Sequence, residues 1–119
     1  MAVTNHRIAS YQYELRQEPS GGELLSVGVL YLYDDHKMLL AMLVFHDSDG
    51  SPDLPQETTD GYITARFPHR ELANFIDMLR NEKPVYLSWT PETQSIRVST
   101  DEEPVGEQEL RKLLSWLYI

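Results

Sequence analysis

The sequence predicts an α+β fold, in which two amphipathic helices pack against an antiparallel sheet of five to six strands. Short apolar or alternating segments, bounded by turn-forming residues, recur before residue 68 and again after residue 84. Two other segments place apolar residues at the i, i+3, i+4 and i+7 spacing of a helix. Together they predict the order strand-strand-strand-strand-helix-strand-strand-helix within one domain, residues 1–119.

Residues 7–15, 24–33 and 38–45 are expected to form the first three strands. The first two alternate, whereas residues 38–45 are apolar throughout, which indicates a central strand covered on both faces. The composition of 38–45 would also suit a helix, but its short length and flanking turns favour a strand. The apolar faces of the first two strands are expected to carry Ala9, Tyr11, Tyr13 and Leu15, and Leu25, Val27, Val29, Tyr31 and Tyr33.

A long loop, a fourth strand and the first helix follow. Residues 46–60 contain two prolines, one glycine and five carboxylates, and loops of this length are often functional. Residues 62–67 alternate again and predict a strand. Pro68 suits the first turn of a helix, and Pro84 cannot continue it. The buried face of this helix is expected to carry Leu72, Phe75, Ile76 and Leu79.

Two more strands and a second helix complete the expected fold. Residues 85–89 and 96–98 alternate on either side of the turn Thr90–Gln94. From Gly106 to the end of the sequence, the leucines return to the helical spacing. The apolar face of the second helix is expected to carry Leu110, Leu113, Leu114 and Leu117.

The charge balance narrows the class of partner. Ten Lys and Arg against nineteen Asp and Glu give a net charge of −9, which disfavours binding to nucleic acid and to anionic membranes. The longest apolar run, residues 38–45, is far shorter than the roughly 20 residues that span a bilayer. The chain has no cysteine and no apolar stretch behind a basic start, so we expect a soluble cytoplasmic protein.

No motif in the sequence indicates catalysis. The chain lacks a thiol nucleophile and a Gly-x-Ser-x-Gly elbow, and its glycines form neither a phosphate loop nor a dinucleotide fingerprint. We therefore expect no catalytic residue and no cofactor. An enzyme site assembled only by the fold stays open.

The acidic loop supplies the weak metal candidates Asp47, Asp49 and Asp53. Their carboxylate oxygens suit calcium, but glycine falls at the wrong position for an EF-hand, so a solvated turn is the preferred interpretation. The histidines His6, His36, His46 and His69 show no paired metal-ligand spacing. The alternative function that remains is small-molecule or metal-ion binding, with a site under the 46–60 loop.

Two tyrosine pairs stand at i, i+2 spacing, which places the members of each pair on one sheet face. If Tyr11 and Tyr13 lay beside Tyr31 and Tyr33, the four rings could stack single-stranded bases. This half of the chain lacks the accompanying cationic groove, so core or subunit-interface packing is the preferred interpretation. Single-stranded nucleic-acid binding remains a second alternative.

The end of the sequence indicates a contact surface. Its last turn is almost wholly apolar, and large apolar patches mark interaction sites. The leading hypothesis is therefore an interaction or regulatory module that binds a protein partner or itself as a homodimer or other homo-oligomer. The expected interface residues are Trp116, Tyr118, Ile119, Tyr31 and Tyr33.

Overall fold

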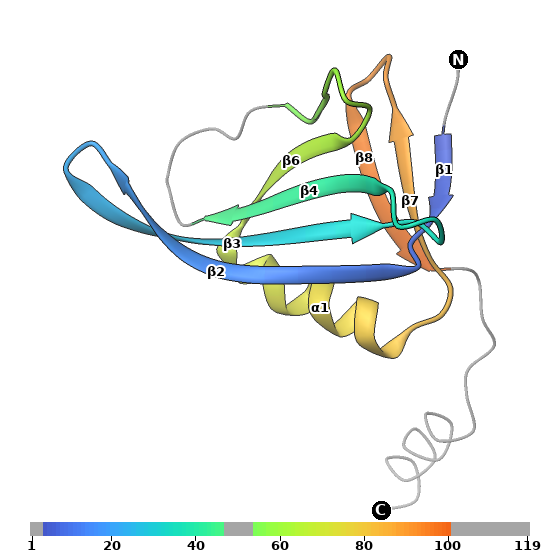
Figure 1. Cartoon of the computed structure of the whole chain (residues 1–119), viewed down its shortest axis with the longest axis horizontal. Coiled ribbons are helices and arrows are strands. Elements are labelled where there is room, and N and C mark those ends of the chain that lie inside the picture. The colour runs from blue at the N-terminus through green and yellow to red at the C-terminus, as the bar shows by residue number, and fades with distance from the viewer. Residues whose placement is uncertain (1–3, 47–53, 101–119) are drawn as a thin grey trace, which may run out of the picture.

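The computed structural model describes residues 4–46 and 54–100, which form two sheets and one helical segment (Figure 1). The five-stranded sheet has the order β2-β3-β4-β6-β5. Its strands are β2 (Ser10–Ser20), β3 (Glu23–Tyr33), β4 (Leu39–His46), β5 (Gln56–Glu57) and β6 (Ile63–Pro68). The three-stranded sheet has the order β1-β7-β8, with β1 (Thr4–Arg7), β7 (Val85–Thr90) and β8 (Ser95–Thr100). The 3-10 turn η1 (His69–Glu71) leads into α1 (Leu72–Asn81).

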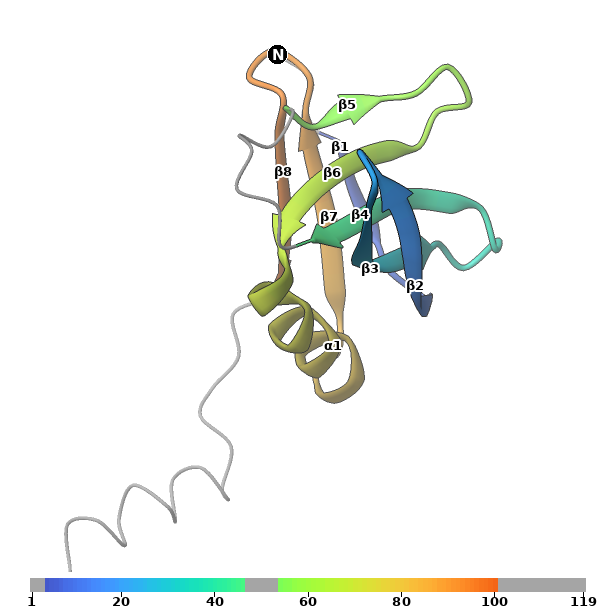
Figure 2. The ribbon, with the colours of Figure 1, turned by 90° about the vertical axis from the view of Figure 1, so that its left-hand side faces the viewer.

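The two sheets and the helix enclose one core. Figure 1 shows β1, β7 and β8 running across the strands of the five-stranded sheet, and Figure 2 shows α1 beside the ends of β7 and β8. Buried side chains from both sheets and from α1 form a single apolar cluster. Its largest fully buried members are Phe45, Leu30, Leu32, Leu43 and Leu87.

Short turns set the register of the hairpins. Gly21 and Gly22 have φ of 60° and 87° and join β2 to β3 as a two-residue turn of the mirror-image type, which glycine adopts without strain. Between β3 and β4, the Asp34 carboxylate accepts hydrogen bonds from the backbone N–H of His36 at 2.8 Å and of Met38 at 2.9 Å. These bonds stabilise the polar turn that the sequence predicts at residues 34–37.

The chain changes sheets at two consecutive residues. The Ile8 N–H donates to the Val85 carbonyl of β7 at 2.8 Å, and the Ala9 N–H donates to the Tyr33 carbonyl of β3 at 2.8 Å. β1 therefore belongs to one sheet and β2 to the other, although no glycine or proline separates them.

Three phenylalanines join the helix to the five-stranded sheet. The ring centroid of Phe45 lies 5.6 Å from that of Phe67 and 5.3 Å from that of Phe75, and Phe67 and Phe75 are 4.8 Å apart. The helix also approaches β3 closely, because a Cβ at Gly28 would lie 2.8 Å from Leu72 Cδ2. The buried helical face that the sequence predicts is confirmed, since Leu72, Phe75, Ile76 and Leu79 all pack into the core.

The expected fold class is wrong. The structure has two sheets instead of one, and β4 pairs with β6 in parallel, so the sheet is not wholly antiparallel. Within residues 4–46 and 54–100 there is one helix, and the second expected helix, residues 106–119, lies outside the described residues. Local periodicity located the strands, but pairing depends on contacts distant in sequence, which periodicity does not encode.

The face assigned to β3 is also corrected. Gly28, Leu30 and Leu32 face the core, whereas Val29, Tyr31 and Tyr33 lie on the outer face of the five-stranded sheet. Because β3 is apolar at nearly every position, its pattern does not reveal which face the helix covers. On the outer face, Val29 is fully buried, whereas Tyr31 and Tyr33 are half-buried.

Within the described residues, no helix has the length and apolar character needed to cross a membrane.

Substituting Phe45→Ala is expected to lower the free energy of unfolding by about 3–5 kcal/mol, because it leaves a cavity and removes two ring contacts. Met38→Ala is the control, since Met38 is 65% exposed and its loss should change stability by no more than about 0.5 kcal/mol. Urea unfolding followed by circular dichroism measures both. Equal effects of the two substitutions would contradict the assigned core.

Candidate functional site

The strands β2 and β3, with their Gly21-Gly22 turn, form a two-stranded ribbon that projects from the domain (Figure 1). All eleven residues of β2 pair with β3, but β4 pairs with β3 only from Val27 onward. The segment from Glu23 to Ser26 therefore has β2 as its one strand neighbour among the described residues. We call residues 10–33 the ribbon.

One face of the ribbon exposes large apolar side chains. Leu15 is 63% exposed and Tyr13 is 47% exposed, although both lie on the side of the sheet that carries the core. The reason is the position of β2 at the edge of the sheet, because α1 packs over the neighbouring strand β3, where Leu72 lies close to Gly28, the strand partner of Leu15. The helix covers Tyr11 at the near end of β2 and leaves Tyr13 and Leu15 uncovered.

An open hollow of about 410 Å³ adjoins this exposed stretch. Its lining combines Leu15 and Gln17 of β2, Ser26 of β3 and His69 of η1. The hollow extends the exposed apolar surface from the ribbon to the start of the helical segment, and it could receive a side chain of a bound partner.

The outer face of the ribbon is polar at its edge and apolar toward its centre. The Tyr31 hydroxyl donates to Glu14 Oε1 at 2.9 Å, and Arg16 Nη1 lies 3.4 Å from the same oxygen. The Tyr33 hydroxyl donates to Gln12 Oε1 at 3.4 Å. Both tyrosines are half-buried, with Tyr31 opposite Met42 and Tyr33 opposite Leu39 of β4, so they offer an amphipathic surface with their polar groups already engaged.

The Tyr31–Glu14 contact changes the acidity of the phenol. The hydrogen bond to the Glu14 carboxylate raises the pKa of Tyr31 above 10.0, and partial burial and the Glu14 charge act in the same direction. Removing the proton would break this bond and place two negative charges side by side. A raised phenol pKa opposes use of Tyr31 as a base near neutral pH, so the contact serves to hold the ribbon surface in shape.

The residues expected at an interface divide into two groups. Tyr31 and Tyr33 lie next to each other on the outer face of the sheet. Trp116, Tyr118 and Ile119 lie outside the described residues.

The four-tyrosine platform is wrong. Tyr31 pairs with Gln12, and Tyr11 pairs with Leu32, so the two tyrosine pairs occupy opposite faces of the ribbon. Paired residues share a face, and the Gly21-Gly22 turn sets a register that matches odd positions of β2 with even positions of β3. The same register, read from the turn, would have placed Leu15 opposite Gly28, but the exposure of Leu15 and Tyr13 becomes visible only in the folded structure.

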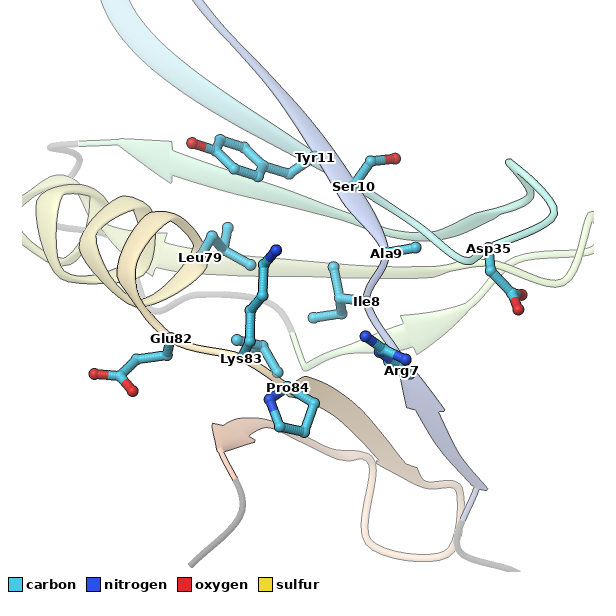
Figure 3. A pocket seen from close by; sticks show the side chains of 11 residues that line it. Arg7, Ile8, Ala9, Ser10, Tyr11, Asp35, Leu79, Glu82, Lys83 and Pro84 are labelled. Carbon is cyan, nitrogen blue, oxygen red and sulfur yellow. The ribbon is translucent and has the colours of Figure 1, made fainter. Parts of the chain in front are cut away.

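A pocket of about 260 Å³ lies at the corner where the chain changes sheets (Figure 3). Ile8, Leu79 and Val85 give it an apolar floor, and Arg7, Lys83, Asp35 and Glu82 stand at its rim. Figure 3 shows the Lys83 side chain reaching across the opening, while the Glu82 carboxylate points away. All four charged side chains are exposed, so the pocket offers a small anion weak, solvent-screened attraction.

A second hollow, of about 240 Å³, lies on the outer face of the sheet beside the 46–60 loop. Met42, Val44 and Leu54 form its apolar part, and Gln56, Thr64 and Arg66 its polar part. The metal candidates Asp47, Asp49 and Asp53 lie outside the described residues. Within the part of the chain that the structure describes, no three His, Asp or Glu side chains gather closely enough to hold a metal ion.

Comparison of the chain with protein-family models, with curated proteins and with solved structures found no match.

The absorbance of Tyr31 at 295 nm, obtained as the difference between wild type and Tyr31→Phe, is expected to titrate above pH 10. Glu14→Gln should move this titration to lower pH, because the negative acceptor is removed. A folded-state pKa above the unfolded value adds stability that is present below pH 10 and is lost as pH rises through the folded pKa. An unchanged titration in Glu14→Gln would refute the assigned cause.

Proposed function

We propose that the protein is a binding module that acts through protein contacts made by the ribbon. The observation that carries the proposal is the exposure of Leu15 and Tyr13 on an eleven-residue strand at the edge of the sheet. Contiguous exposed apolar side chains with a polar surround are typical of protein-binding surfaces.

The chemistry of the ribbon supports a protein as the ligand. Tyrosine brings large contact area at low conformational cost, and all four of the ribbon's tyrosines are exposed or half-buried. Among the described strands β2 pairs with β3 alone, and its other edge adds backbone donors and acceptors that an extended segment of a partner can match. A small ligand would use little of so long a surface.

The second candidate function is small-ligand binding at the hollow beside the 46–60 loop. The combination of Met42, Val44 and Leu54 with polar Gln56 and Arg66 favours it, since small-molecule sites are mostly apolar with a few orienting polar groups. At about 240 Å³ the hollow is smaller than the usual range of about 300–1,000 Å³ for such sites. The protein-binding proposal is therefore preferred.

A photo-crosslinking amino acid tests the proposal. We expect benzoylphenylalanine at position 13, introduced in living cells of the host, to yield protein–protein crosslinks, because Tyr13 is aromatic and 47% exposed in the ribbon. The matched control carries the same group at Arg97, an exposed position of β8 on the other sheet. Gel shift and mass spectrometry of the products measure the yield and the partner.

Crosslinks of equal yield at both positions, or at neither, would contradict the proposal. Native mass spectrometry of the protein purified from its host then decides the alternative, since a monomer with a reproducible extra mass supports small-ligand binding.

A further inference from the structure

We propose that the free edge of β2 pairs with β2 of a second copy of this chain, antiparallel and centred on Leu15. Two five-stranded sheets would then join into one continuous sheet. The inference rests on the proposed function, because it names the partner of the same ribbon.

The open edge is confined to one side of the five-stranded sheet. β5, at the other edge, has two residues, whereas β2 has eleven and pairs with β3 alone among the described strands. Proteins usually protect a long edge strand with proline, inward-pointing charges or a covering segment. In β2 the one proline, Pro19, stands beside the turn, so the middle of the strand keeps its backbone donors and acceptors.

The backbone geometry identifies the residues that face the open edge. The Tyr33 carbonyl accepts from Ala9 N–H, and the two-glycine turn closes on the pair Ser20–Glu23. The first observation shows that the backbone groups of Tyr33 point toward β2, so those of its strand partner Ser10 point toward β3. The second shows the same for Ser20, the partner of Glu23. Since both backbone groups of a residue point to the same side in an antiparallel pair, the even-numbered residues of β2 face β3. The residues that present N–H and C=O to the edge are therefore Tyr11, Tyr13, Leu15 and Gln17.

Charge selects the register. An antiparallel second copy must pair odd residues with odd residues, so that their edge groups meet. Centring the pair on Glu14 or on Arg16 would place that residue opposite itself, and like charges directly opposite are destabilising. Centring on Leu15 places Glu14 of each copy opposite Arg16 of the other, which makes two complementary pairs.

Length selects the same register. Leu15 is the middle residue of β2, so pairing centred on it overlaps the strand from Ser10 to Ser20 in full. Centring on Tyr13 or Gln17 would leave part of each strand unpaired.

The same arrangement covers the exposed apolar residues. Leu15, 63% exposed in the single chain, would lie directly opposite Leu15 of the second copy. Tyr13 of each copy would lie opposite Gln17 of the other and next to the two leucines. Opposite residues on one face of an antiparallel pair come within contact distance, so this pairing removes the apolar surface from water.

Charge reversal tests the inference. We expect Arg16→Glu alone and Glu14→Arg alone each to raise the dissociation constant of the dimer about tenfold, because each makes both cross-copy pairs repulsive. The double variant Glu14→Arg/Arg16→Glu should restore wild-type affinity. An equimolar mixture of the two single variants should form the heterodimer in preference to either homodimer, since only that combination pairs opposite charges.

Analytical ultracentrifugation measures the affinities, and native mass spectrometry of the mixed variants measures the heterodimer. Arg97→Glu, an equal charge change at an exposed site of β8, is the matched control and should leave the affinity unchanged. Urea unfolding of each variant shows that the single chain remains folded.

A wild-type chain that stays monomeric, or a dimer whose dissociation constant is unchanged by the charge reversals, would overturn the inference. Crosslinks from position 13 to a different protein would in that case leave the proposed function standing. Absence of crosslinks from position 13 to any protein would overturn both.

Discussion

The structure depends on the corner at Ile8 and Ala9, where two successive backbone N–H groups donate hydrogen bonds to different sheets. Ile8 donates its N–H to β7 and Ala9 donates its N–H to β3, so the chain leaves one sheet and enters the other without a loop. This corner fixes the three-stranded sheet against the five-stranded sheet at one edge. The apolar residues of β4, α1 and β7 can then share a single core, which Phe45, Phe67 and Phe75 tie to the helix.

Much of the local structure could be predicted from the sequence, whereas the partners of the strands could not. Alternation and turn residues located β2 to β4 and β6 to β8, and the helical spacing gave the buried face of α1. The corner at Ile8 and Ala9 was not predicted, because it contains neither glycine nor proline. The parallel pairing of β4 with β6 was not predicted, because it depends on contacts between residues on either side of the intervening loop.

The ribbon shows why an apolar pattern alone does not identify a core. Leu15 and Tyr13 continue the apolar face of β2, and sequence analysis placed them with Tyr11, which does contact the core. Whether such residues are covered depends on which strands the neighbouring helix packs over, and α1 packs against β3, the strand next to the edge. The Gly21-Gly22 turn was the one local signal able to fix the register and to separate Tyr31 from Tyr11.

The pairing of β1 with β7 has a consequence for the order of folding. Thr4 lies opposite Trp89, so β1 finds its partner only after the residues up to β7 have been synthesised. The five-stranded sheet, made from residues 10–68, pairs mainly between strands close in sequence, and closing short loops costs less entropy. Pairing of β1 therefore requires β7, whereas β2, β3, β4 and β6 can pair with one another before β7 and β8 have been synthesised.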